Sequence, residues 1–262
     1  MEPFLLDSED ELFTITFSES VENHVGMQQI GKKLDEGFSR KELREIRTKF
    51  EERGLTCKIY NLNKYLPDDV DDVEKATVLV IRNGLSILSN INGIKKELNN
   101  QKELVDKKAL MRGKIVNKHA RWNLCYADKE QEPDYEKGKG RVINFKDIPY
   151  INNIRENLGK YTGYENLFAE LNYYYDINKC GIGFHGDSER KLVIGIRIGT
   201  SLKLHYQWYK SYKPIGERCK IKLNDGDVYI MSDKAVGYDW KRPSIYTLRH
   251  ATGCKKYVYP NK

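Results

Sequence analysis

The sequence predicts an α+β protein in two parts: a small α/β segment over residues 1–108 and a β-sandwich or jelly-roll barrel over residues 109–262. Helix and strand patterns alternate in the first part, whereas the second part has one helix followed by short strands with turn residues between them. The charge divides in the same place. The first part holds 17 Lys and Arg against 21 Asp and Glu (−4), and the second holds 28 against 17 (+11).

The first part opens with a strand over residues 11–17, in which apolar and polar residues alternate. Ser39 followed by Glu42 is the signature of a capping box, which predicts a helix over residues 40–53. The other expected elements are strands at 57–60 and 76–82 and a polar helix at roughly 93–109. No catalytic motif occurs in this part, and the lone His24 is interpreted as a structural residue.

The second part begins with a polar, glycine-containing loop over residues 128–141 and a helix near 150–158. Eight short strands are expected to follow, at 168–177, 182–185, 191–198, 202–209, 218–223, 227–231, 245–250 and 255–259. Short strands separated by turns at this density are typical of a sandwich or a jelly-roll barrel.

Composition indicates an intracellular protein. No run of eighteen apolar residues could form a membrane-spanning helix, and the first residues are too few and too acidic for a signal peptide. The five cysteines are scattered without a CxxC pair, which favours reduced thiols over a disulfide framework. We therefore expect a cytoplasmic or nuclear location.

The strongest chemical signal is His185-Gly186-Asp187, followed at a distance by His250. Two histidines and one carboxylate can hold non-haem Fe(II) on one face and leave positions open for O₂ and a co-substrate. Residues i and i+2 of a strand point the same way, so His185 and Asp187 are expected to share a face. An H-x-D motif is weak alone, but an apolar strand precedes this one.

The identity of the distal ligand leaves alternatives. His250 is preferred because imidazole is the usual ligand at this position. If residues 245–249 form the closing strand of the barrel, the ligand should fall near 237–241, where Asp239 would have to serve. His205 is the third possibility, although it lies close in sequence to the H-x-D motif.

In motif order, residues 109–262 resemble the AlkB-like dioxygenases. The matching pieces are Asn172-Tyr-Tyr174, the H-x-D-x-E run from His185 to Glu189, a strand ending in Gly199, and the turn Gly226-Asp227 before a distal histidine. The resemblance implies a double-stranded β-helix that uses Fe(II), 2-oxoglutarate and O₂. It also implies that Asn172 and Tyr174 contact 2-oxoglutarate.

The family's arginine anchor for the far carboxylate of 2-oxoglutarate, which lies downstream of the distal histidine, has no counterpart here. Only lysines, among them Lys255 and Lys256, follow His250. Arg197 is one candidate, because glycines flank it on the strand face opposite Ile194, Ile196 and Ile198. Arg249 is the other, since Tyr246-Thr-Leu-Arg249 resembles the family's closing strand. Arginine suits the role because its planar guanidinium can bind a carboxylate with two hydrogen bonds.

The substrate is expected to be nucleic acid, with a modified base as the target of hydroxylation or demethylation. The resemblance places Glu189 and Arg190 near that base. Aromatic and lysine residues interleave around Trp208, a pattern that suits base stacking and phosphate contacts. The alternatives are a protein hydroxylase of the prolyl or lysyl type and a non-catalytic nucleic-acid-binding barrel. The basic residues could also form no more than a solvated surface.

Overall fold

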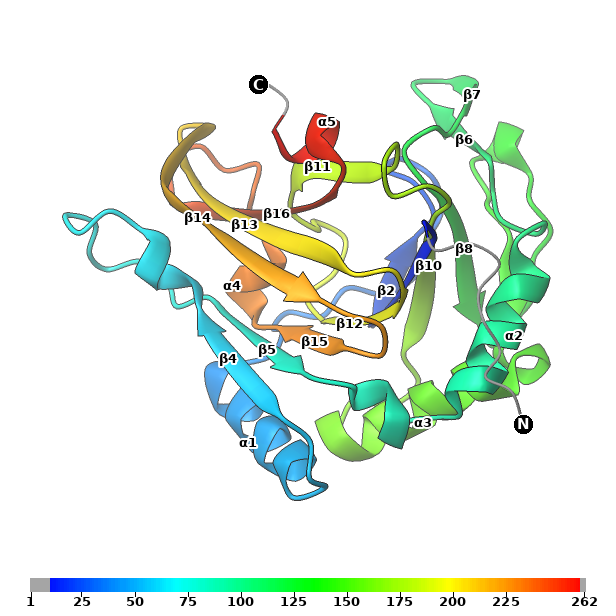
Figure 1. Cartoon of the computed structure of the whole chain (residues 1–262). Helices are drawn as coiled ribbons and strands as arrows, with labels where there is room; N and C mark the ends of the chain where they lie inside the picture. The colour runs from blue at the N-terminus through cyan, green and yellow to red at the C-terminus, as the bar shows by residue number, and fades with distance from the viewer. Residues whose placement is uncertain (1–9, 260–262) are drawn as a thin grey trace.

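The structure, a computed structural model, describes residues 10–259 and shows a mixed α+β fold in which strands predominate (Figure 1). The strands are β1 (Leu12–Ser18), β2 (Ser20–Glu22), β3 (Gln29–Gly31), β4 (Cys57–Asn61), β5 (Thr77–Ile81), β6 (Lys108–Met111), β7 (Lys114–Asn117), β8 (Trp122–Ala127), β9 (Val142–Asn144), β10 (Phe168–Tyr174), β11 (Gly181–His185), β12 (Val193–Gly199), β13 (Leu202–Lys210), β14 (Lys213–Leu223), β15 (Val228–Met231) and β16 (Thr247–Gly253). The α-helices are α1 (Arg40–Glu51), α2 (Ile91–Gln101), α3 (Pro149–Thr162), α4 (Asp233–Val236) and α5 (Lys255–Val258).

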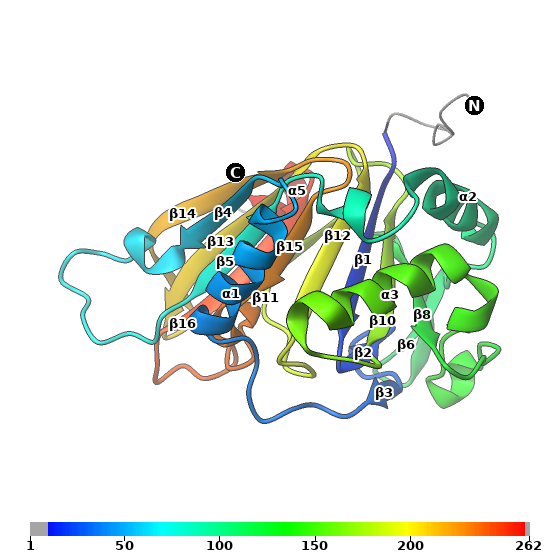
Figure 2. The same cartoon turned by 90° about the horizontal axis from the view of Figure 1, so that it is seen from below.

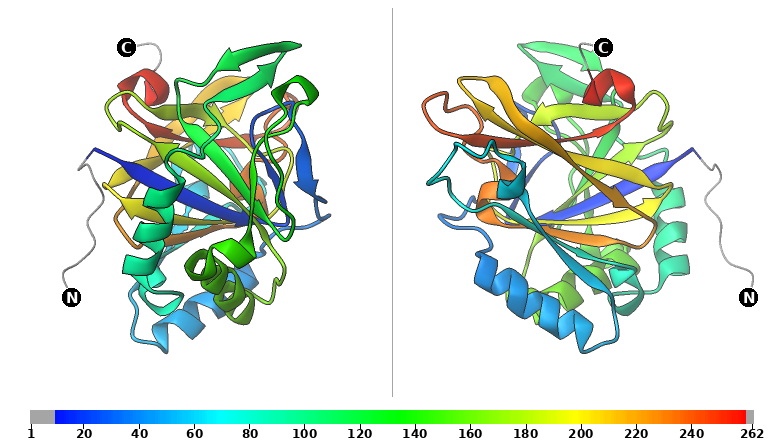
Figure 3. Two further views of the ribbon diagram at one scale, coloured as in Figure 1. Left: turned by 90° about the vertical axis from the view of Figure 1, so that its right-hand side faces the viewer. Right: turned by 60° about the vertical axis from the view of Figure 1, so that its left-hand side comes forward.

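Two sheets form the body of the protein. The large sheet has the strand order β4-β5-β15-β12-β1-β10-β8-β9, and the small sheet has the order β11-β16-β13-β14. Apolar side chains of β5, β12 and β15 pack against those of β13, β14 and β16, so the two sheets face each other. The small sheet, the large sheet and the helices are successive layers (Figure 3).

The outer face of the large sheet is covered by α1, α2 and α3 (Figure 2). Strand alternation explains why this face is apolar. In β1, Phe13, Ile15 and Phe17 lie in the core beneath the helices, and Thr14 and Thr16 point the other way. The inner face of this strand is therefore polar, and it looks toward the small sheet.

The sequence predicted two parts that divide at residue 108, but the pairing of the strands joins both parts in one sheet. β1 lies between β10 and β12, with Thr14 opposite both Asn172 and Arg197. Strands β4 and β5 extend the same sheet beside β15. Residues of the first part thus complete the sheet of the second part, because β1 supplies hydrogen bonds to both of its neighbours.

Helix α1 confirms the predicted capping box. The Ser39 hydroxyl accepts a hydrogen bond from the Glu42 backbone N–H, and the Glu42 carboxylate accepts one from the Ser39 N–H. The helix ends at Glu51, two residues before the predicted end. Its apolar side carries Leu43, Ile46 and Phe50 into the core.

Removing this cap should weaken the fold. We expect Ser39→Ala to lower the free energy of unfolding by about 1 kcal/mol, because two backbone donors at the helix start lose their partners. Urea denaturation measures the change. Ser39→Asp keeps an accepting oxygen and should stay close to the original stability. Equal stability of all three proteins would contradict the role of the cap.

Two predicted elements are wrong. The polar helix expected to reach residue 109 ends at Gln101, and residues 108–117 form the β6–β7 hairpin. Residues 255–259 hold helix α5 in place of a strand. Gly253 adopts a φ of 125° and approaches Gly181 closely, so β16 ends there and the chain turns away. Within residues 10–259, no helix has the length and apolar character needed to cross a membrane.

Candidate metal centre

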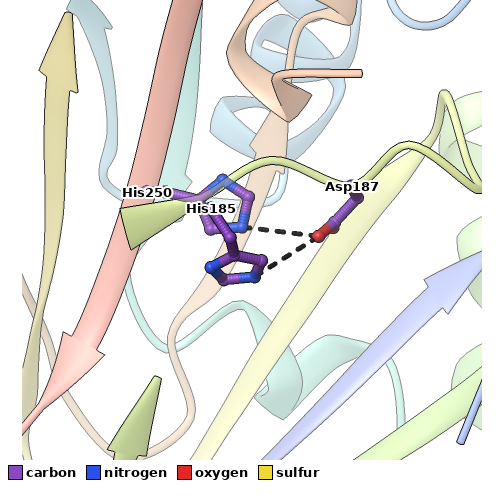
Figure 4. A group of neighbouring side chains, drawn as sticks. All are labelled: His185, Asp187 and His250. Carbon is purple, nitrogen blue, oxygen red and sulfur yellow. Dashed lines mark ion pairs between the residues drawn. The ribbon is translucent and has the colours of Figure 1, made fainter. Parts of the chain in front are cut away.

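Three predicted ligands meet between the two sheets. His185 ends β11, Asp187 follows in the next turn, and His250 lies in β16 directly opposite His185. Their ligand atoms all lie within 4.8 Å of one another. The nearer Asp187 oxygen is 3.4 Å from His185 Nε2 and 3.7 Å from His250 Nε2. The three side chains converge on one point (Figure 4).

His185 and Asp187 come together in a different way from the one expected. Asp187 lies beyond the end of β11, so strand alternation does not align it with His185. The turn at Gly186 brings the carboxylate back instead. A Cβ atom at Gly186 would lie 2.0 Å from the backbone oxygen of Gly237, so this position admits only glycine. The Asp187 N–H also donates to the Val236 carbonyl, at 3.1 Å.

Both histidines direct their Nε2 atoms toward the Asp187 carboxylate. His185 Nδ1 lies 2.8 Å from the Gly183 carbonyl oxygen, which favours the tautomer with its proton on Nδ1. His250 is buried, and its Nδ1 has no hydrogen-bond partner among residues 10–259. Burial holds the pKa of His250 well below its ordinary value, and the neighbouring His185 lowers it further. A neutral imidazole is the form that binds a metal.

An open cavity of about 540 Å³ surrounds this centre. Its walls come from the inner faces of both sheets, from residues 22–25 at the end of β2 and just after it, and from Trp240 and Lys241. A volume of this size is within the range of small-molecule sites. The candidate metal centre therefore lies in an open pocket.

Arg197 reaches into this cavity from β12 and is only 1% exposed. Its Nη2 donates to the Thr252 hydroxyl at 3.3 Å, whereas Nε and Nη1 have no partner within residues 10–259. Gly195 makes room for the Tyr229 ring, which lies beside the guanidinium. A buried charge without a counter-ion is costly, so this arginine is poised for an anion.

Asn172 and Tyr174 also line the cavity, from one face of β10. The Asn172 amide is already bonded: its oxygen accepts from Arg121 and from Asn123, and its nitrogen donates to Glu170. Burial raises the pKa of Tyr174, which keeps the phenol protonated. Tyr174 is thus placed to contact a ligand, and Asn172 is placed to orient Arg121.

Two predicted binding residues do not reach the cavity. Arg249 precedes His250 on β16 and therefore points to the opposite, outer face of the small sheet, where its guanidinium lies 4.0 Å from the ring centre of Tyr209. Trp208 is buried in the core between the sheets, and its indole N–H donates to the Leu62 carbonyl at 2.9 Å. The sequence alone did not show which face of its strand each of these two side chains occupies.

Glu189 and Arg190 do line the cavity, as a paired group. Arg190 is buried and bonds to Glu170 at 2.7 Å and to Glu189 at 2.8 Å. Its charge is therefore balanced by protein carboxylates, in contrast to that of Arg197. This pairing gives Arg190 a structural role in the cavity wall.

The alternative distal ligands lie elsewhere. His205 is on the outer face of β13, since its neighbour Tyr206 is the residue paired with His250. Asp239 is buried against Lys234, with 2.5 Å between the carboxylate and the ammonium. Of the three candidates, His250 is the one that the structure brings to His185 and Asp187. Lys255 and Lys256, the alternative anchors, are exposed on α5 and outside the cavity wall.

Sequence reasoning missed several residues of the cavity wall, because no motif marks them. Thr14 and Thr16 could have been found from their polar positions in an otherwise apolar strand, but the sequence does not show that β1 joins this sheet. His24, interpreted as a structural residue, lies in the wall with Val25. Burial lowers the pKa of His24.

Comparison with known proteins gives a match over nearly the whole chain. The chain is 50% identical over 249 residues to an uncharacterized protein of Acanthamoeba polyphaga mimivirus, and the alignment covers 95% of this chain and 98% of the viral one. No family model matches the sequence.

Proposed function

The chain belongs to the same family as this mimivirus protein, and we propose that it is an Fe(II)- and 2-oxoglutarate-dependent oxygenase built on a double-stranded β-helix. The architecture supports this proposal through its two facing sheets and the site between their inner faces. The residues that would bind the metal come from β11, from the turn that follows it and from β16, and the residue that would bind the co-substrate comes from β12.

The observation that carries the proposal is the presence of two features in one cavity. His185, Asp187 and His250 form a two-histidine, one-carboxylate set, and Arg197 offers a buried guanidinium that has no counter-ion among residues 10–259. Three ligands of this kind could also hold Zn²⁺. The unpaired Arg197 favours Fe(II) with a dicarboxylate co-substrate, because such a molecule can bind the metal at one end and an arginine at the other.

The donor set fits the proposed metal. When bound, Fe(II) and 2-oxoglutarate would activate O₂ for hydroxylation and release succinate and CO₂. The chain's own residues hold and orient the components. Arg197, held by the Thr252 hydroxyl, would bind the far carboxylate, and Tyr174 would close the wall beside it. Val193, Leu204 and Met231 supply apolar side chains to the same cavity wall.

The activity can be tested by the conversion of 2-oxoglutarate. Purified protein with Fe(II), O₂ and 2-oxoglutarate should form succinate. The correct class of substrate should accelerate this turnover. Stimulation by methylated oligonucleotides would support a nucleic-acid substrate, whereas stimulation by peptides alone would support a protein hydroxylase. Absence of metal binding would favour the non-catalytic alternative.

Nucleic acid is the substrate class that the charge supports best. The whole chain carries a formal net charge of +7, and the excess of basic residues lies in residues 109–262, which carry +11. Lys241 and Trp240 lie together at the cavity wall. A cation beside an aromatic ring suits contact with both a phosphate and a base.

Binding to a single-stranded oligonucleotide should depend strongly on salt. If roughly four phosphates are neutralised, the logarithm of the affinity should fall against the logarithm of salt concentration with a slope of about −3. Fluorescence anisotropy across a salt series measures this slope. Lys241→Ala should reduce it by roughly 0.7, and the exposed Lys41→Ala on α1 serves as a control. Failure to bind at low salt would remove nucleic acid as the substrate.

A further inference from the structure

The loop that carries Asp187 is held by a segment of chain on its far side. This segment consists of residues 237–246, which connect α4 to β16, and is called the 237–246 segment below. Its Gly237 packs directly against Gly186, and the Trp240 indole N–H donates to the Ser188 hydroxyl at 3.0 Å. The Val236 carbonyl, next to this segment, accepts the Asp187 N–H. Both neighbours of Asp187 are thus in contact with the 237–246 segment.

The other side of the same segment is fixed to the outer face of the small sheet by Arg249. The Arg249 guanidinium lies over the ring of Trp240 at 5.0 Å and over Tyr209 at 4.0 Å. Its Nη2 lies 3.4 Å from the Trp240 carbonyl oxygen. Arg249 Nε is buried and has no hydrogen-bond partner among the described residues, so the contacts with the rings are its main stabilisation.

Further contacts hold the segment near the same end of the sheet. The Tyr212 hydroxyl donates to the Lys241 carbonyl at 2.9 Å, and Lys210 donates to the Ser244 carbonyl at 2.7 Å. Neither side chain touches Trp240 in these bonds. Arg249 is therefore the link between the outer face of β16 and the residue that bonds to the Asp187 loop.

We propose that Arg249 is a positioning residue that, by holding Trp240 against Ser188, keeps the Asp187 carboxylate within reach of His185 and His250. This inference rests on the proposed function, because it assigns a role toward the same metal centre. His250 and Arg249 are neighbours on β16 and point to opposite faces, so one strand presents a ligand on its inner side and the support for another ligand on its outer side. Outer supports of this kind tune metal affinity without touching the metal.

The position of Trp240 can be measured without any metal. Protein labelled with 5-fluorotryptophan should give three ¹⁹F resonances, for Trp122, Trp208 and Trp240, assigned with Trp240→Phe. We expect Arg249→Ala to shift or broaden the Trp240 resonance and to leave that of Trp208 in the core unchanged. Arg249→Lys keeps a cation over the rings and should leave all three resonances close to their original positions.

The consequence for the metal centre is measured by Co(II) titration, followed by visible absorption. Arg249→Ala should weaken Co(II) binding about tenfold, and Arg249→Lys should restore most of the loss. Lys220→Ala is the matched control, because it removes a cation over Tyr259 on the same sheet face, away from the 237–246 segment. Equal losses in Arg249→Ala and Lys220→Ala, or an unchanged Trp240 resonance in Arg249→Ala, would overturn the proposal.

The two readouts also separate this inference from the function on which it rests. If the unaltered protein failed to bind Co(II), the proposed metal centre would be wrong. The ¹⁹F spectra would still decide whether Arg249 positions Trp240. A resonance shift confined to Trp240, together with intact Co(II) binding in every variant, would show that Arg249 holds Trp240 but does not act on the metal site.

Discussion

His250→Ala is expected to lower the affinity for Fe(II) by more than about 100-fold. Loss of an outer support of a metal ligand typically costs 10- to 100-fold, so loss of one of three ligands should cost more. His185→Ala and Asp187→Ala should behave in the same way, because the three ligand atoms lie within 4.8 Å of one another. Anaerobic equilibrium dialysis with Fe(II) measures the affinity.

His205→Ala is the matched control for this prediction. His205 is also a buried histidine of the small sheet, 4% exposed, but it points to the outer face beside Tyr259. Burial and the nearby arginine and lysines lower its pKa to about 4, so it is neutral like His250. Its removal should leave Fe(II) binding intact. If His205 proved necessary and His250 dispensable, the ligand set would be wrong.

Arg197→Met is expected to abolish 2-oxoglutarate binding and to stabilise the protein without ligands. Arg197 is 1% exposed and has no counter-ion in the described part of the chain, so an apolar side chain of similar length relieves the cost of a buried charge. Thermal unfolding of the metal-free protein should therefore move to a higher temperature. Isothermal titration with 2-oxoglutarate in the presence of Mn(II) measures the loss of binding.

Arg197→Lys tests the geometry of the same anchor. Lysine keeps the charge but lacks the planar fork of arginine, so the dissociation constant for 2-oxoglutarate should rise by at least about tenfold. Arg249→Lys is the control, because Arg249 lies on the outer face of the small sheet and lysine keeps a cation over Trp240. Unaltered affinity in both Arg197 variants would contradict the assignment of the anchor.

The cluster of His185, Asp187 and His250 could be predicted from the sequence, because a short motif and the usual preference for a histidine ligand favoured these three residues. The sequence alone left His205 and Asp239 open. Only the pairing of β13 with β16 shows that Tyr206, and not His205, lies opposite His250. Asp239 is excluded by its contact with Lys234, which no sequence pattern marks.

The two arginine candidates illustrate the same limit. The glycines beside Arg197 correctly placed it on the inner face of β12, since a Cβ at Gly195 would collide with Tyr229. Arg249 was a candidate anchor because residues 246–249 resemble the closing strand of the AlkB-like family. Its side chain points outward because alternation along β16 assigns the inner face to His250. The flanking glycines thus predicted the orientation of Arg197, whereas strand alternation corrected the expected orientation of Arg249.

The role of the first part of the chain could not be predicted because it depends on contacts between distant segments. β1 reads as an amphipathic strand, and such a strand can join many antiparallel sheets. Its insertion between β10 and β12 links residues that lie more than 150 positions apart, for example Thr14 with Asn172. No local pattern in a single sequence carries that information.

The most direct test of the central claim is the anaerobic addition of Fe(II) and 2-oxoglutarate to the purified protein. Chelation of the metal by the 2-oxo acid at a two-histidine, one-carboxylate centre should produce a weak visible charge-transfer band that neither component gives alone. We expect the band in the unaltered protein and in His205→Ala, and its loss in His250→Ala and Arg197→Met. No band in the unaltered protein, under conditions where Fe(II) binds, would contradict the assignment of this cavity to 2-oxoglutarate-dependent oxygenation.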